Sequence, residues 1–274
     1  MDISPVTALV TLLMGMLSGS LGAMVGIGGG VFLVPFLVLV VGLPFHQAAA
    51  VSLAAVIATS TAVSAATAGK HLINLRLGMV LEVATAAGGL AGGLTAMMLS
   101  PEALQATFAV VALFVAAALA RRTETPPLPH DADVGRLGGR FVDERTGETV
   151  TYRVHQLPAA LVASFFAGNL STLLGIGGGV VKVPILVTWC GVPMRVAAAT
   201  SAFMIGVTAT SGAVIYYGHG EMNPALAASA VLGTQMGSAV GLRVASRVRA
   251  RGLQRMLAAV LVLVAVLMLT RSLS

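Results

Sequence analysis

Most of this chain consists of long apolar segments that contain almost no charged residues. Charged side chains make up 9% of the 274 residues, and 12 of the 26 (16 basic, 10 acidic) fall between Arg121 and Arg153. Soluble domains carry about 25% charged residues, so this composition excludes a soluble globular enzyme and is typical of a membrane protein. Because lipid offers no partner to a backbone amide, such segments are expected to fold as helices.

Charges, prolines and glycine clusters divide the apolar sequence into ten predicted helices. Their ranges are 5–25, 29–42, 47–68, 77–99, 102–120, 158–175, 178–190, 195–217, 224–245 and 253–270. A bilayer core about 30 Å thick needs about 20 helical residues, so 29–42 and 178–190 are short. The first segment lacks the basic start of a secretory signal and is expected to be retained. The predicted fold is an all-α integral membrane protein with about ten transmembrane helices.

The chain also repeats itself at an offset of 149 residues. Residues 19–31 match 168–180, and both stretches contain Gly-Ile-Gly-Gly-Gly. The same offset, without gaps, pairs further Gly, Pro, Ser, Thr and Asn residues, which chance similarity between apolar segments does not explain. Each half holds about five helices, and an odd number makes the second half enter the membrane from the opposite side. The sequence thus predicts two inverted repeats, 1–120 and 158–274.

Basic residues gather on one side of a ten-span arrangement. This side holds the loop with Lys70 and Arg76, the segment 121–157, Arg195 and the stretch 243–255. By the positive-inside rule it is cytoplasmic, which places both termini outside a multi-pass protein of the plasma membrane. An eight-span arrangement, with 29–42 and 178–190 re-entrant, is the alternative and would place the N-terminus elsewhere.

The segment 121–157 joins the halves and carries six Arg and six acidic residues. Apolar residues alternate around Thr146 and Gly147, which favours a small β-hairpin at the cytoplasmic surface. The segment is expected to be a solvated connector, and the alternative is a regulatory or partner-binding role.

The two glycine runs are the strongest local signal. Glycine costs about 1 kcal/mol relative to alanine in a helix, so each run is expected to break its helix. The exposed N-terminal amides of the next helix, which begins near Gly29 or Gly178, suit an anion. The alternative is that these glycines only permit close helix packing. The candidate binding residues here are Gly28, Gly29, Gly30, Gly177, Gly178 and Gly179.

Charged and hydroxyl side chains within the apolar segments are further candidates. Lys182 either offsets the charge of a bound anion or extends to the membrane interface. Glu82 either pairs with Arg76 or extends to the interface, or it belongs to a proton relay. Hydroxyls recur at matched positions on one helical face, either lining a polar path or bonding to helix carbonyls. The polar candidates for binding an anion are Ser52, Thr59, Ser201, Thr208 and Asn169.

Other site classes find no support in the residues. The glycine runs lack the Gly-Lys-Ser/Thr of a phosphate-binding loop and the strand and distant acid of a dinucleotide site. No catalytic constellation, metal site or cofactor is expected, so the chain is not expected to be an enzyme. The net charge of +6 lies in short loops and does not indicate nucleic-acid binding.

The paired motif Gly-x6-Gly-Ile-Gly-Gly-Gly-x4-Pro, at 19–35 and 168–184, resembles the sulfite exporter TauE/SafE family of membrane permeases. The resemblance covers nearly the whole chain apart from 121–157. It implies a carrier for sulfur-containing anions such as sulfite, sulfoacetate or thiosulfate. The positions that match the family motif are Gly28, Gly29 and Gly30 with Pro35, and Gly177, Gly178 and Gly179 with Pro184.

The function expected from these observations is secondary transport of a small anion, in the export direction, across the plasma membrane by alternating access. Without an ATP-binding motif, an ion gradient or the membrane potential would supply the energy. A passive anion channel and a structural or sensory membrane protein are the alternatives. The expected partners are the anion, the lipid bilayer and, from the small-residue stripes on helix surfaces, a second copy of the chain.

Overall fold

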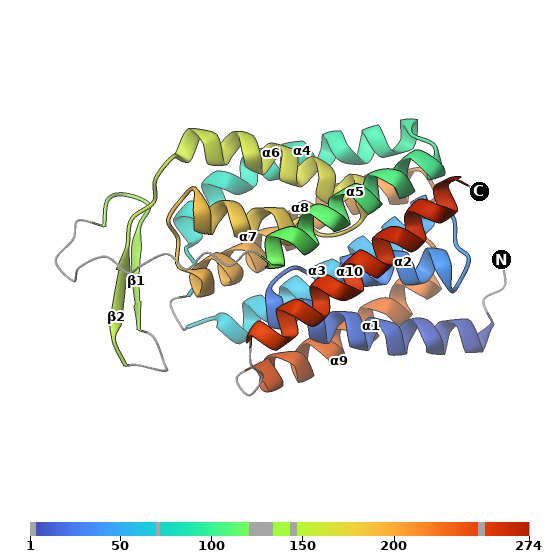
Figure 1. Ribbon diagram of the computed structural model, residues 1–274, viewed down its shortest axis with the longest axis horizontal. Coiled ribbons are helices and arrows are strands. Elements are labelled where there is room, and N and C mark those ends of the chain that lie inside the picture. Colours follow the sequence, from blue (N-terminus) through green and yellow to red (C-terminus); the bar gives the residue numbers. More distant parts are fainter. Residues whose placement is uncertain (1–3, 70–71, 121–133, 143–146, 246–249, 274) are drawn as a thin grey trace.

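A computed structural model describes residues 4–69, 72–120, 134–142, 147–245 and 250–273. The described part of the chain forms ten helices and one pair of strands (Figure 1). The elements are α1 (Pro5–Val25), α2 (Gly30–Leu39), α3 (Phe45–Thr67), α4 (Leu75–Met98), α5 (Pro101–Ala120), β1 (Gly139–Val142), β2 (Thr149–Tyr152), α6 (Leu157–Leu174), α7 (Gly179–Thr188), α8 (Met194–Gly218), α9 (Pro224–Ala245) and α10 (Ala250–Leu273).

Six helices, α1, α3, α4, α6, α8 and α9, are long and apolar enough to cross a membrane, which makes this a multi-helix membrane protein. The helices predicted at 29–42 and 178–190 are shorter than expected. Each has ten residues and extends about 15 Å, which is half the thickness of a bilayer core. Several helices begin earlier than predicted; α4 starts at Leu75 because the Asn74 side chain accepts a hydrogen bond from the Leu77 amide (3.1 Å).

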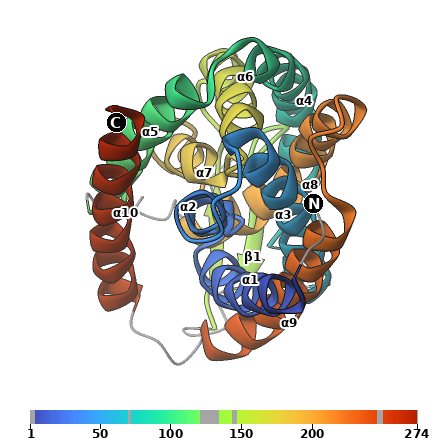
Figure 2. The same ribbon diagram turned by 90° about the vertical axis from the view of Figure 1, so that its right-hand side faces the viewer.

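Helices from the two halves of the chain interlock. α1 packs on α9 and α4 packs on α6, while α3 packs on α8 and α5 on α10. Under the offset of 149 residues, α1 corresponds to α6 and α4 to α9, so the first two contacts are counterparts of each other. Seen from the end, these two pairs lie on opposite sides of α3 and α8, with α2 near the middle (Figure 2). The main packing partners of α1, α3, α4 and α5 therefore all belong to the other half of the chain.

Glycines allow these helix pairs to approach closely. A methyl group at Gly237 of α9 would touch the carbonyl oxygen of Met16 on α1, and one at Gly88 of α4 would touch that of Phe165 on α6. The offset of 149 relates both members of these two contacts. Only a residue without a side chain fits where backbones meet at this distance.

A hairpin follows the first five helices. β1 and β2 pair antiparallel, with Phe141 opposite Val150, and they lie at the end of the molecule far from both chain termini (Figure 1). Asn74 Nδ2 donates to the Tyr152 hydroxyl (3.0 Å), and the Asn74 amide donates to Thr200 on α8 (2.9 Å). Burial raises the pKa of Tyr152, although the bond from Asn74 lowers it, so the phenol stays neutral. Residues 121–133 and 143–146 of the predicted linker, with Thr146, lie outside the described residues.

Candidate functional site

Both glycine runs interrupt their helices. α1 ends at Val25, and Gly26, Gly28 and Gly29 then have φ values of 77°, 88° and 75° before α2 begins at Gly30. The second run has the same conformation, with Gly178 at φ 70° just before α7. Side chains disfavour this left-handed region. The predicted helix breaks are thus confirmed, and α2 and α7 begin one residue after the predicted Gly29 and Gly178.

The two breaks meet at the centre of the molecule. A methyl group at Gly28 would lie 3.3 Å from Val56 and 3.5 Å from Ile205, and one at Gly177 would lie 2.7 Å and 3.1 Å from the same two side chains. Val56 is on α3, Ile205 is on α8, and the offset of 149 relates them. Both are buried, with 0% and 1% of their surface exposed. These two side chains, which we call the apolar pair, fill the space where the glycine loops meet.

Each helix break also contacts a helix of the opposite half. A methyl group at Gly26 would lie 3.1 Å from Ala198 on α8, and one at Gly175 would lie 2.9 Å from the Ala49 side chain on α3. Ala49 and Ala198 are again related by the repeat. The small side chains at these two positions let the loops reach the molecular centre.

Two serines related by the repeat differ in their hydrogen bonds. Ser52 of α3 donates from Oγ to the carbonyl oxygen of Gly175 in the opposite loop (2.6 Å). Its counterpart Ser201 of α8 is also fully buried, but its hydroxyl has no partner among the described residues. An unpaired buried hydroxyl is costly, so Ser201 is available to bind a ligand.

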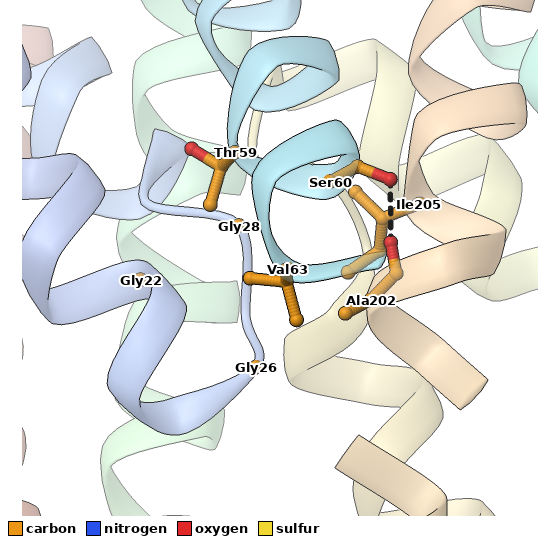
Figure 3. Close-up of a pocket in the computed structure, with 8 residues that line it drawn as sticks. All are labelled: Gly22, Gly26, Gly28, Thr59, Ser60, Val63, Ala202 and Ile205. Atoms are coloured by element: carbon orange, nitrogen blue, oxygen red, sulfur yellow. Dashed lines mark hydrogen bonds between the residues drawn. The ribbon is translucent and has the colours of Figure 1, made fainter. Parts of the chain in front are cut away.

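Thr59 lines a cleft beside the first glycine loop (Figure 3). The cleft is narrow, with about 170 Å³ of space between atoms when the part open to the outside is counted, and lies between α1, α3 and α8. The Thr59 hydroxyl donates back to the Ala55 carbonyl (3.2 Å). The lining residues are Gly22, Gly26, Gly28, Thr59, Ser60, Val63, Ala202 and Ile205.

Lys182 and Thr208 belong to a buried charged cluster together with Glu82. The Lys182 ammonium donates to Thr208 Oγ1 (2.7 Å), and Thr208 donates to Glu82 Oε1 (2.7 Å). Glu82 Oε2 lies 3.6 Å from Lys182 Nζ and accepts a hydrogen bond from Thr85 (2.8 Å). Lys182 therefore does not extend to the interface, and Glu82 pairs with Lys182 rather than with Arg76.

The structure thus separates the predicted site residues into groups. The six glycines, Ser52 and Ser201 surround or flank the apolar pair, Thr59 lies in the cleft, and Lys182 and Thr208 lie in the charged cluster. Asn169 stands apart on α6, where its carbonyl oxygen approaches Gly92 of α4. Sequence reasoning did not single out Val56 and Ile205, although the offset of 149 matches two bulky apolar residues on helices rich in small ones.

Chemically, the centre offers half-helix N-termini, hydroxyls and apolar side chains rather than reacting groups. Within the described ranges, no cluster of three His, Cys, Asp or Glu side chains could hold a metal ion. The amides at the starts of α2 and α7 carry partial positive charge. Such an arrangement can bind a small anion.

Comparison with known proteins places the chain in a family. The family model described as "Sulfite exporter TauE/SafE" matches residues 11–268. The probable membrane transporter protein YunE of Bacillus subtilis (strain 168) is 24% identical over 232 residues, which cover 82% of this chain and 84% of that protein. The sulfite exporter TauE/SafE family protein 6 of Arabidopsis thaliana is 42% identical over 66 residues, covering 24% of this chain and 15% of that protein. No solved structure matches. The chain therefore belongs to the sulfite exporter TauE/SafE family of membrane transporters, as the paired glycine motif indicates.

Proposed function

We propose that this protein is a secondary transporter of a small anion, sulfite or another sulfur oxyanion, in the plasma membrane. It works by alternating access, in which two inverted repeats move about a central site. The name of the family supports the substrate class, as do the names of the Arabidopsis relatives, whose similarity covers only part of this chain.

The observation that carries this proposal is the meeting of the two glycine breaks at the apolar pair. Transporters built from inverted repeats bind their substrates where broken helices converge near the bilayer midplane. Here each break starts a ten-residue helix, and its first amides and dipole favour an oxyanion. The proposed ligands are the amides at Gly28, Gly29 and Gly30, those at Gly177, Gly178 and Gly179, and the hydroxyls of Ser52 and Ser201. Two of these donors, the Gly179 amide and the Ser52 hydroxyl, bond to the carbonyl oxygens of Gly177 (3.0 Å) and Gly175 (2.6 Å) in this conformation and have to leave them to bind an anion.

The helix arrangement supports the inverted topology. α1 runs from the end that holds both chain termini toward the hairpin end, whereas its counterpart α6 starts near the hairpin and runs the other way (Figure 1). The interlocked contacts α1–α9 and α4–α6 are also those expected of two repeats related by a twofold axis in the membrane plane.

The apolar pair favours a carrier over an open pore. Val56 and Ile205 have 0% and 1% of their surface exposed and pack against both glycine loops. An anion at the centre has to displace both side chains, which requires α3 and α8 to move. The cleft at Thr59 is the proposed route by which the anion reaches Gly28.

Uptake of ³⁵S-labelled sulfite or thiosulfate into proteoliposomes tests the proposal. Alanine at Gly28 or Gly177 introduces a methyl group against the apolar pair and in a left-handed conformation. We expect saturable uptake by the wild type and a rate at least about tenfold lower in both variants, which corresponds to about 1.4 kcal/mol.

The matched control is Gly42→Ala. Gly42 has a similar φ of 78° but open space around it, so this variant carries the backbone strain without the contact with the apolar pair. It is expected to transport at close to the wild-type rate. Undiminished uptake in both Gly28→Ala and Gly177→Ala would refute the proposed site, and single-channel currents would refute the carrier.

A further inference from the structure

The charged cluster is buried in an otherwise apolar region. Lys182 and Glu82 have 1% and 9% of their side-chain surface exposed, and Thr208 bridges them by accepting from the ammonium and donating to the carboxylate. The repeat does not require this cluster, since Leu33 corresponds to Lys182 and Val231 corresponds to Glu82 under the offset of 149 residues. A charged pair in a membrane helix is costly and is by default functional.

Lys182 also lies next to the proposed anion site. It is in the first turn of α7, where its backbone amide donates to the carbonyl of Gly178 in the glycine loop (3.0 Å). Side chains on a helix lean toward its N-terminus, so the ammonium is the cation available to an anion bound at this loop. In the present conformation Glu82 neutralises that cation.

Charge balance links the anion to a proton. With Lys182 paired to Glu82, the cluster has no net charge. An anion that takes the ammonium from an ionised Glu82 leaves a buried carboxylate with only the hydrogen bonds from Thr208 and Thr85 and no countercharge, which is strongly unfavourable. A proton taken up from water by a Glu82 carboxylate oxygen removes this obstacle and restores the charge balance.

We propose that Glu82 is a proton-binding site, so that each anion that binds at Lys182 is accompanied by one proton on Glu82. This inference rests on the proposed transport function and adds its coupling ion. When the anion leaves on the other side of the membrane, Glu82 returns its proton to water there and pairs with Lys182 again. The transporter thus moves anion and proton in the same direction, and the sum of their gradients sets that direction.

Few other charged groups compete for this carboxylate. α4 packs on α6, which has no ionisable residue, and on α8. The titratable groups on α4, α7, α8 and the adjoining hairpin strand β2, besides Glu82, are Arg76, Lys182, Arg195, Tyr216, Tyr217 and Tyr152. Arg76 lies about 9 Å along α4 from Glu82, and Arg195 lies about 20 Å along α8 from Thr208. Within the described chain, Lys182 is the charged group that contacts Glu82.

Thiosulfate is the suitable probe because it stays ionised across the pH range of interest, so a pH effect reports on the protein. Linkage between one proton and one anion makes wild-type affinity fall about tenfold per pH unit once Glu82 is ionised. In Glu82→Gln the site mimics the protonated state. We expect its affinity for thiosulfate to be independent of pH, as measured by binding to the purified protein at several pH values.

Transport gives a second readout. With the membrane potential clamped at zero, coupling to one proton lets a gradient of one pH unit support about tenfold accumulation of labelled thiosulfate. Glu82→Gln is expected to lose this accumulation, although thiosulfate still exchanges across the membrane. The matched control is Glu102→Gln, which removes a carboxylate in the first turn of α5, outside the cluster. It is expected to accumulate thiosulfate as the wild type does.

The outcomes separate the two proposals. If the wild type shows no saturable uptake of thiosulfate or sulfite, the transport function is contradicted and the coupling falls with it. Two outcomes would contradict the role of Glu82 and leave the transport function supported. In the first, uptake by the wild type is saturable but neither its affinity nor its accumulation of thiosulfate changes with pH. In the second, Glu82→Gln keeps the wild-type pH dependence. If Glu82→Gln fails to insert, Glu82→Asp decides: a shifted pH profile supports the proposal and an unshifted one overturns it.

Discussion

At the scale of single residues, the repeat places matching hydroxyls on α3 and α8 but does not give them the same bonds. Ser52 closes a contact between the halves by donating to Gly175, whereas Ser201 has no partner in the described part of the chain. The difference matters because a hydroxyl that bonds two elements together stabilises this conformation, whereas a buried hydroxyl without a hydrogen-bond partner is a candidate to bind a ligand.

Replacing each serine with alanine tests this assignment. Ser52→Ala leaves the Gly175 carbonyl buried without its partner, so we expect a loss of about 1–3 kcal/mol in stability. Ser201→Ala removes an unpaired hydroxyl and is expected to change stability by less than about 0.5 kcal/mol. Thermal unfolding of both variants in detergent measures the difference. Equal destabilisation of the two would contradict the assignment.

Sequence alone identified Lys182 and Thr208 as polar candidates but did not join them to Glu82. The two charged residues are 100 positions apart, and periodicity within one helix says nothing about contacts between helices. A physical signal was nevertheless present, since opposite charges in apolar segments are expected to pair. Asn169 shows the reverse case, because its position just before a glycine run did not bring it to the centre.

At the scale of elements, the helix breaks follow from the sequence while their meeting point does not. Four glycines in each run predict an interruption, because few other residues accept the positive φ values seen at three of the four. Both segments were predicted to be short, but α2 and α7 end earlier than predicted, because apolar residues continue past Leu39 and Thr188 without a clear polar boundary. The contact of the two glycine loops with the apolar pair depends on tertiary packing, which the spacing of residues in the sequence does not predict.

The close packing of α9 on α1 predicts that Gly237 cannot be replaced without a loss of stability. Gly237→Ala introduces a methyl group against the Met16 carbonyl, so the two helices have to separate. We expect a loss of at least about 1–3 kcal/mol, seen as a lower unfolding temperature in detergent or as a reduced yield of inserted protein.

Gly218→Ala is the control for this variant. Gly218 ends α8 and has nothing within 4 Å of the added methyl group. Its replacement is expected to leave stability unchanged or to raise it by up to about 1 kcal/mol, because alanine favours the helix. Wild-type stability of Gly237→Ala would show that the α1–α9 contact is looser than described.

At the scale of the whole molecule, the two halves exchange partners rather than forming separate bundles. α1 and α4 of the first half both pack on helices of the second half, and the hairpin between the halves is tied to α4 and α8 through Asn74. We therefore expect a movement of one half to be transmitted to the other in the proposed alternating-access cycle.

Cysteine labelling tests the sidedness expected from the positive-inside rule. Val142 on β1 and His219 after α8 are exposed, while the native Cys190 is buried and can be replaced by serine. The start of α8 lies beside the hairpin, because Thr200 and Tyr152 both bond to Asn74, and His219 follows about 28 Å farther along the helix. An impermeant maleimide is expected to label His219→Cys in intact cells, and Val142→Cys only after permeabilisation. The reverse pattern would place the hairpin outside the cell.

The charged cluster joins the two halves at one place only, because Leu33 and Val231 stand where the repeat would place a second lysine and glutamate, and this makes the proposed transport cycle unequal in its two directions. In a protein with exact twofold symmetry, the states open to either face would be related by the twofold axis and would have the same energy. Here the pair Lys182 and Glu82 differs from the corresponding pair Leu33 and Val231, so the two states of the proposed cycle make different contacts. Since states with different contacts differ in population, we expect the empty carrier to favour one face and influx and efflux to have unequal maximal velocities.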